Sequence, residues 1–432
     1  MGRKMFKEQI EKYLYRRQYL LAPSCTHCFN NWKQIQISKD HFLTTHPDLP
    51  VTSVHCRNKS IYLLGYIIDP YKPDFDDSQI MNDIINKSET ADDVFENIAD
   101  KCGRFVIIVK TENDFRIFSD ACGLRQVFYH FDKKNKAVWC ASQPHIIAQQ
   151  LGIQVNDMIK SDLQKTSLFK SEEHWYPGII TLFDDIFHLT PNHYLDGNSG
   201  RFIRYWPKER LSPISMSECM PKVSKLLSGI IEGALNRYNL AFAISCGLDS
   251  RTLFATSRKS AKNIHYFTHA RKNEVDRNPD VLIPAKMLKQ LGLQHSVFIP
   301  PEKMDEDFKD IFQKNVFTAR TAKGLNAISI QEHFKNDDKE IVVIFGNCSE
   351  ITKRDRFRFP KTPKSLISGT VLAAMALMSQ SDIAENEFAK WLIPVKQLTK
   401  YNIDILDLMH WEQRVGNWGA MTFSEYEMVH ES

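Results

Sequence analysis

The residues best suited to chemistry stand at positions 245–250, between an apolar run at 240–244 and the start of a helical pattern. They read Ser245-Cys246-Gly247-Leu248-Asp249-Ser250. The backbone N–H groups of such a loop and the positive end of the following helix can hold an anion, and a glycine lets phosphates approach the main chain. Ser245 and Ser250 add hydroxyl donors. We therefore expect phosphate binding at this junction.

Asp249 indicates that a cation belongs to the same loop. A carboxylate does not fit a pure anion site unless a cation bridges it to the phosphates, so Asp249 predicts magnesium. The loop is not a Walker motif, because it lacks the G-x-x-x-x-G-K-[ST] spacing and the lysine. An ordinary explanation is equally open, in which Ser245 or Asp249 only caps the helix that follows.

The elements around this loop predict a parallel sheet. An amphipathic helix is expected over 216–238, and strands then alternate with helices. This rhythm is typical of parallel crossovers and of a doubly wound sheet, where ligands bind at the carboxyl ends of the strands. The expected strands are 240–245, 264–269, 295–300 and 341–346, and the clearest expected helices between them are 250–259 and 280–292.

The first half of the chain has a different pattern. Short β-branched and aromatic runs separated by polar turns predict an antiparallel sheet, and a few helical stretches make this half α+β. The expected strands are 61–69, 104–110, 115–120, 127–132 and 137–142, and the expected helices are 78–87, 90–100 and 144–150. We therefore expect one domain over 1–206, a linker over 207–214 and a second domain over 215–432.

Composition excludes several classes of protein. The 432 residues are 43% hydrophobic and 25% charged, as in globular chains of more than one domain. Basic residues exceed acidic ones by only four and are scattered, so nucleic acid is not an expected partner. No window approaches the roughly 20 apolar residues of a membrane span, and we expect a cytoplasmic protein. The nine cysteines fit reduced thiols, and the Cys25/Cys28 pair lacks the second pair of a structural zinc site.

The loop at 245–250 resembles the pyrophosphatase loop S-G-G-x-D-S of the asparagine synthetase family, with Cys246 in place of one glycine. Further segments follow in the family's order over roughly residues 60–432. GRFVIIV at 103 and CASQPHIIAQQLG at 140 are similar to the closing strands of an N-terminal amidotransferase domain. IVVIFGNCSE at 341 is similar to the second pyrophosphate loop, and WEQRVGNWGAM at 411 resembles the helix that lines the substrate pocket.

The resemblance implies ATP and Mg²⁺ as cofactors and assigns residues to them. Asp249 and Glu350 would hold the magnesium. On the pocket helix, Glu412 would orient a base and Arg414 would clamp a carboxylate, although a salt bridge on an exposed helix explains both equally well. Asn347 stands where asparagine-forming enzymes carry an acidic residue, so aspartate is not the expected substrate. The implied nucleotide site comprises Ile244, Ser245, Gly247, Asp249, Ser250, Thr268, Phe345 and Gly346.

Two departures from the family pattern affect these expectations. The family hydrolyses glutamine with an N-terminal cysteine, whereas this chain begins Met1-Gly2 and carries Cys25 and Cys28 internally. We expect no glutamine hydrolysis and a degenerate amidotransferase-like domain that serves structure or holds a partner protein. The chain also ends at Ser432, before the position of a lysine that the family uses in catalysis, so either the sequence is truncated or the catalytic apparatus is incomplete.

The expected function is that of an ATP-dependent ligase which forms an amide bond. A small-molecule or peptide carboxylate would be adenylated with release of pyrophosphate, and an amine that this chain does not obtain from glutamine would then displace AMP. This chemistry is closest to the lactam-forming and peptide-cyclising branch of the family. Two alternatives stay open: a pyrophosphatase-loop enzyme that modifies a nucleobase, and a catalytically incomplete ligase homologue that binds a nucleotide or a peptide without turnover.

Overall fold

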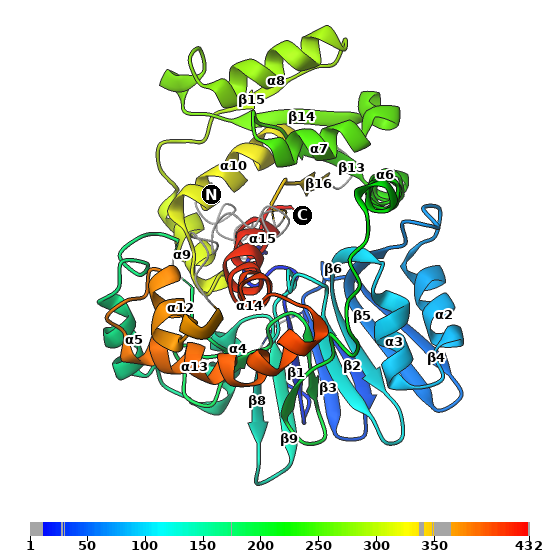
Figure 1. The fold of residues 1–432 in the computed structure, drawn as a ribbon, viewed down its shortest axis with the longest axis vertical. Coiled ribbons are helices and arrows are strands. Elements are labelled where there is room, and N and C mark those ends of the chain that lie inside the picture. The colour runs from blue at the N-terminus through cyan, green and yellow to red at the C-terminus, as the bar shows by residue number, and fades with distance from the viewer. Residues whose placement is uncertain are drawn as a thin grey trace.

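The structure is a computed structural model. It describes residues 12–26, 29, 31–173, 175–336, 341–347, 349 and 364–430. Two six-stranded antiparallel sheets and one four-stranded parallel sheet organise the chain (Figure 1). The expected mixed α/β fold, antiparallel in the first half and parallel in the second, is confirmed.

The two antiparallel sheets pack face to face, and we call them the sandwich. The first sheet has the order β10 (Phe187–His188), β8 (Phe128–Asp132), β9 (Ala137–Ala141), β1 (Tyr19–Ala22), β3 (His41–Thr45) and β2 (Lys33–Ser38). The second has the order β12 (Arg201–Arg204), β11 (His193–Asp196), β7 (Phe115–Ser119), β6 (Cys102–Lys110), β5 (Lys59–Ile68) and β4 (Val51–Cys56). The four strands before residue 57 were not among the predicted strands.

Alternating side chains divide each strand of the sandwich between two cores. In β5, Tyr62 and Leu64 lie in the core between the sheets, whereas Ile61 and Leu63 lie on the outer face. Helices α2 (Asp77–Lys87) and α3 (Ala91–Ile98) cover that outer face, and each begins at a capping box. Helix α4 (Pro144–Leu151) covers the outer face of the other sheet, and α5 (Asp157–Gln164) follows it.

The parallel sheet carries the predicted loop. Its order is β15 (Ser296–Phe298), β14 (Ile264–His269), β13 (Asn239–Ala243) and β16 (Ile341–Ile344). The chain therefore moves outward from β13 to β15 and returns to the other side of β13, so the strand order reverses between β13 and β16. Such a switch point is where open parallel sheets bind ligands.

Helices cover both faces of the parallel sheet. On one face, Phe242 and Tyr266 pack in a core with residues of α6 (Met216–Arg237), α7 (Leu248–Thr256) and α8 (Pro279–Gln290). On the other face, Ala241 and Val343 pack with residues of α10 (Thr321–Phe334) and with Tyr426. Helix α9 (Glu306–Asn315) and short 3₁₀ turns at Arg258–Asn263 and Lys272–Glu274 complete this half.

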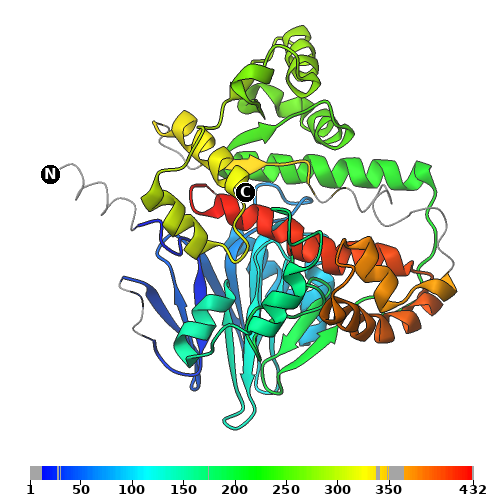
Figure 2. The ribbon, with the colours of Figure 1, turned by 90° about the vertical axis from the view of Figure 1, so that its left-hand side faces the viewer.

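The C-terminal helices connect the two halves. They comprise a 3₁₀ turn at Lys364–Leu366, α12 (Gly369–Met375), α13 (Asp382–Lys396), a second 3₁₀ turn at Gln397–Tyr401, α14 (Ile405–Leu408), a π-helix at Met409–Gly419 and α15 (Ala420–Glu427). In Figure 2 the red helical stretch that includes α15 lies between α6 and the sandwich, and the orange helices lie beside the sandwich. A π-helical run of this length is unusual, since most are single turns near functional sites. In the part of the chain that is described, no helix is long and apolar enough to cross a bilayer.

Candidate functional site

The predicted loop joins β13 to α7 directly. The strand ends at Ala243, and Gly247 is the N-cap of α7, which begins at Leu248. The N-cap residue is a glycine and makes no side-chain capping bond. The first turn of α7 offers backbone N–H groups of the kind that bind anions at helix N-termini.

The two serines shape the loop from inside. The Ser245 N–H donates to Ser250 Oγ at 3.1 Å, and the Gly247 N–H donates to Ser245 Oγ at 3.1 Å. Ser250 is buried. The hydroxyls thus hold the loop in a tight turn, in addition to the role as phosphate donors that the sequence predicted for them.

Two side chains from neighbouring elements fix the loop from outside. Thr268, near the end of β14, donates from Oγ1 to the Ile244 carbonyl oxygen at 2.5 Å. Asp280, in the first turn of α8, accepts from the Cys246 N–H at 3.0 Å. Thr268 was a predicted nucleotide contact, and in the structure its hydroxyl bonds to the backbone of Ile244 at the start of the loop. Asp280 was missed, although a carboxylate in the first turn of the next helix is a recognisable signal.

The second predicted loop touches the first. Strands β13 and β16 are parallel neighbours, with Leu240 opposite Val342 and Phe242 opposite Ile344. A Cβ added to Gly346 would lie 3.0 Å from the Ser250 backbone nitrogen, so only glycine allows this approach without a shift. Ser349 Oγ donates to the Gly346 carbonyl oxygen at 3.2 Å and closes the second loop.

Part of the predicted metal site lies outside the described residues. Glu350 is not described, so the ion shared between Asp249 and Glu350 stays a prediction. In the described ranges, no three His, Cys, Asp or Glu side chains are grouped to hold a metal. Asn347, directly after Gly346, is half-buried beside the two loops.

Helix α15 forms the wall beside the second loop. The Phe345 ring stacks on Tyr426 with centroids 4.8 Å apart, and the Phe423 ring lies edge-on at 6.3 Å. The helix at Trp411–Trp418, which was expected there, packs on the sandwich instead. Trp411 Nε1 donates to the Ala121 carbonyl oxygen at 2.6 Å, and Gly416 lies against the ring of Pro191.

Glu412 is held in a buried polar cluster rather than at a pocket. Its carboxylate accepts two bonds from Arg204 at 2.8 and 2.6 Å, one from Asn192 at 2.8 Å and one from Trp391 Nε1 at 2.8 Å. Burial alone raises the pKa of this carboxyl, but the nearby charges of His193 and Arg204 outweigh it and hold the pKa below its ordinary value. Both oxygens are engaged, which is the chemistry of a structural ion pair.

Arg414 does not pair with Glu412. Its guanidinium lies over the Trp418 ring, 4.6 Å from the centroid, and its side chain is half-buried. The ion partner of Glu412 is Arg204 on β12, so the salt bridge is buried rather than on an exposed helix face, and the role of Arg414 as a carboxylate clamp stays a prediction.

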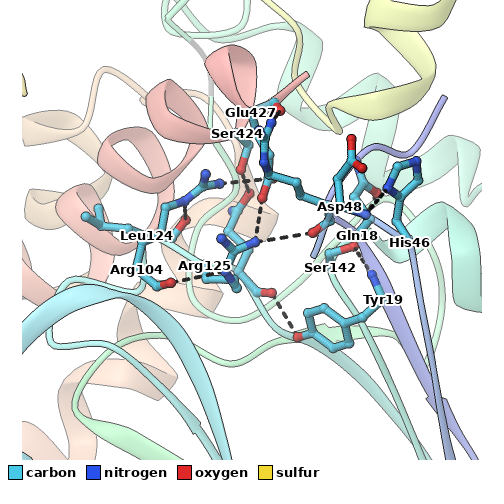
Figure 3. Close-up of polar contacts among 12 residues, drawn as sticks. Gln18, Tyr19, His46, Asp48, Arg104, Leu124, Arg125, Ser142, Ser424 and Glu427 are labelled. Atoms are coloured by element: carbon cyan, nitrogen blue, oxygen red, sulfur yellow. Dashed lines mark hydrogen bonds and ion pairs between the residues drawn. The ribbon is translucent and has the colours of Figure 1, made fainter. Parts of the chain in front are cut away.

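A second buried cluster, not predicted, ties α15 to the sandwich (Figure 3). Glu427 pairs with Arg104 at 3.0 Å and with Arg125 at 2.5 Å, and Arg17 donates to the Glu427 carbonyl oxygen at 2.8 Å. Ser424 Oγ donates to Gln126 Oε1 at 3.2 Å. These residues are all buried. A shift of α15 would therefore disturb its contacts with the sandwich on one side and with Phe345 on the other.

The C-terminal part of α15 is held by a further ion pair, made by Glu425. Arg320, at the start of α10, bonds to both oxygens of Glu425 at 2.6 to 3.0 Å. Burial raises the pKa of the Glu425 carboxyl to about 7, and Arg320 opposes that rise.

The predicted free thiol of Cys25 lies far from these helices in the chain. It is exposed in the loop after β1, where it bonds to Gln34.

A narrow pocket lies where the sandwich meets the C-terminal helices. It is lined by Phe128, His188, Trp175, Phe317 and Asn417, among others. Asn417 donates to the Gln413 carbonyl oxygen at 2.7 Å, so its Oδ1 faces His188 and accepts from Nδ1 at 3.0 Å. Burial lowers the pKa of His188 to about 4, which keeps the imidazole neutral.

Comparisons with known proteins leave the family open. No family model and no curated protein matches this sequence. Among solved structures, the chain is similar to a glutamine phosphoribosylpyrophosphate amidotransferase from B. subtilis complexed with ADP and GMP, at 11% identity and a TM-score of 0.26, over 78% of this chain and 77% of that one. It is also similar to an allosteric regulatory enzyme of purine biosynthesis, at 11% identity and a TM-score of 0.29, over 78% and 71% of the two chains. TM-scores this low carry no argument about family or function, so the resemblance to the asparagine synthetase family stays a prediction.

Proposed function

We propose that this protein is an ATP-dependent, AMP-forming ligase that joins a carboxylate to an amine. The observation that carries the proposal is the contact of two glycine loops at the switch point of the parallel sheet. Gly346, after β16, reaches the backbone of Ser250 in the first turn of α7. Loops that meet in this way at the carboxyl ends of neighbouring parallel strands are suited to hold the phosphates of a nucleotide.

In this proposal the residues of the loops have separate roles. The first turn of α7 binds the α-phosphate of ATP, and Gly247 and Gly346 let the phosphates approach the main chain. Asp249, with Glu350 from the second loop, provides the carboxylate oxygens that magnesium prefers. Magnesium, when bound, offsets negative charge on the phosphates. Asp249 fits this role because it lies in the first turn of α7, where its negative charge would repel a phosphate that carries no cation.

The proposed reaction has two steps. The carboxylate oxygen of the substrate attacks the α-phosphorus, the bond to the β-phosphate oxygen breaks, and pyrophosphate leaves. The amine then attacks the acyl carbon and AMP departs with the electron pair of the broken C–O bond. Asn347 is our candidate for substrate contact because it follows Gly346 in the second loop. We propose that the amine is not made from glutamine at Cys25, an internal thiol bonded to Gln34.

A second candidate function is nucleotide or peptide binding without turnover. The observation that favours it is the position of Glu412, whose two oxygens are occupied by Arg204, Asn192 and Trp391. A carboxylate bonded in this way supports the fold and does not orient a catalytic base. Under this candidate, ATP binds at the same loops but no pyrophosphate is released.

Release of pyrophosphate separates the two functions. Purified protein would be mixed with MgATP and a panel of small carboxylates and peptides, with and without ammonium. We expect pyrophosphate and AMP in equal amounts, dependent on the carboxylate, and no release by Asp249→Ala. The matched control is Glu112→Ala, at an exposed turn of the sandwich. Binding of ATP without release would support the second function, and pyrophosphate release that survives Asp249→Ala would contradict the first.

A further inference from the structure

Asp280 makes a contact with the first loop that the proposed function does not use. Its Oδ1 accepts from the Cys246 N–H at 3.0 Å. The same carboxylate raises the pKa of the Cys246 thiol. Asp280 therefore acts on both polar groups of Cys246, through a hydrogen bond to the N–H and through its charge at the thiol.

The backbone around Asp280 is fixed, so the contact is built into the fold. Asn278 is the N-cap of α8, and its Oδ1 accepts from the Asp280 N–H at 2.9 Å. Thr268 Oγ1 lies 3.4 Å from the Asp280 carbonyl oxygen and 2.5 Å from that of Ile244. These contacts fix the position of α8 relative to the loop after β13.

The three N–H groups before α7 differ in their acceptors. Those of Ser245 and Gly247 donate to the hydroxyls of Ser250 and Ser245, which belong to the loop itself. The N–H of Cys246 donates to a carboxylate from another element. An amide N–H makes one strong bond, so a phosphate oxygen that reaches Cys246 has to replace the Asp280 oxygen.

The charge of the ligand decides whether its phosphate can replace the Asp280 oxygen at the Cys246 N–H. A bare phosphate that approaches the loop meets the carboxylate of Asp280 at the donor and that of Asp249 in the first turn of α7. Like charges at such separations oppose binding, whereas a divalent cation carried by the nucleotide reverses the sign of the interaction.

We propose that Asp280 determines the specificity of the loop by closing it against metal-free anions and admitting a nucleoside triphosphate only with a divalent cation. This inference rests on the proposed function, because it assigns a selecting residue to the same nucleotide site. Asp280 is a positioning and selecting residue, and it takes no part in bond making.

The test compares Asp280→Asn with the control Asp276→Asn, which changes an exposed aspartate just before α8. The asparagine keeps an oxygen for the Cys246 N–H and removes the charge. We expect its affinity for ATP in EDTA, measured by calorimetry, to rise about tenfold, as removal of one close like charge predicts. The affinity for MgATP should change less than threefold, and inorganic phosphate should follow metal-free ATP. Thermal melts would confirm that both variants fold.

A second readout reports the contact without any nucleotide. Asp280→Asn should lower the pKa of the Cys246 thiol, so iodoacetamide should alkylate Cys246 faster at pH 8 than in wild type, as peptide mass spectrometry can follow. Asp276→Asn should leave this rate unchanged. Unchanged alkylation in Asp280→Asn would show that the Asp280 charge does not act on Cys246, and it would overturn the inference.

The outcomes separate this inference from the proposed function. Weaker binding of both ATP forms by Asp280→Asn would overturn the inference, because Asp280 would then be a ligand of the bound ion. If neither wild type nor variant binds ATP in any form while alkylation still accelerates, the contact stands and both the selection and the proposed function are wrong.

Discussion

Gly346 approaches Ser250 so closely that a Cβ at position 346 would lie 3.0 Å from the Ser250 backbone nitrogen. This contact joins the loop after β16 to the first turn of α7, although the two residues are almost 100 positions apart in the chain. The contact can be tested by substitution, because any side chain at position 346 must push the two loops apart and lower the stability of the protein.

Gly346→Ala should therefore destabilise the protein by about 1 to 3 kcal/mol, the usual cost of overpacking. The comparison is Gly247→Ala, where φ is −64° and the added Cβ would meet only the Ser245 hydroxyl, at 3.1 Å. Urea unfolding of both variants measures the difference in free energy. Equal losses in the two variants would show that the loops are not in contact at Gly346.

Glu412→Gln should lower the free energy of unfolding by about 3 kcal/mol, because it removes the charge of a fully buried carboxylate and leaves the partly buried Arg204 guanidinium without its ion partner. Chemical denaturation measures this loss. If Glu412→Gln instead abolished ligase activity with no loss of stability, Glu412 would be catalytic and its structural role would be refuted.

Stability should fall as the pH drops from about 6.5 to about 4, in part through His188. Burial lowers the pKa of this histidine to about 4 in the folded chain, whereas the unfolded chain binds the proton near pH 6.5. Because the folded pKa is depressed, the contribution is complete above pH 6.5 and is lost towards pH 4, by up to about 3 kcal/mol. His188→Asn cannot titrate, yet its amide can still donate to Asn417. Unfolding at several pH values should give a shallower slope for this variant, and identical slopes would exclude His188 as a source.

Glu427→Gln should loosen α15, because this carboxylate is the ion partner of both Arg104 and Arg125. We expect a loss of about 3 to 5 kcal/mol and faster amide hydrogen exchange over residues 420–427. Asp310→Asn serves as the control, since its pair with Lys314 is exposed and should contribute less than about 0.5 kcal/mol. Unchanged exchange in Glu427→Gln would mean that the cluster does not hold the helix.

The junction at 245–250 could be predicted because its signals are local. The apolar strand, the small residues of the loop and the restart of a helical pattern all lie within about 20 positions, and the alternation of strands and helices fixes a parallel sheet. The same rhythm places β13 and β16 in one sheet. It does not give the distance between their loops, which depends on how Gly346 packs on α7.

Strands β2 and β4 were missed for a local reason. Strand β2 reads Lys-Gln-Ile-Gln-Ile-Ser, and β4 contains His55 and two hydroxyl residues, so the apolar pattern is sparse. Only one face of each strand needs apolar side chains, as Ile37 and Val54 provide, and pairing with β3 and with β5 stabilises the rest.

The polar clusters could not be predicted because their partners are distant in sequence. Glu412 pairs with Arg204 over 208 positions, and Glu427 pairs with Arg125 over 302. In the sequence both carboxylates look like residues of solvated helix faces. Their burial follows from the packing of the π-helix and α15 on the sandwich, which no periodicity indicates. Asp280 differs, because its position in the first turn of α8 is visible, although its acceptor role toward Cys246 is not.

Whether the two loops bind MgATP through Asp249 can be decided by calorimetric titration of MgATP. We predict saturable binding by wild type and by the surface control Glu112→Ala, and at least a tenfold loss of affinity in Asp249→Ala with its fold intact by thermal melting. Equal affinity in Asp249→Ala and wild type would contradict the proposed nucleotide site, because the nucleotide would then be bound elsewhere.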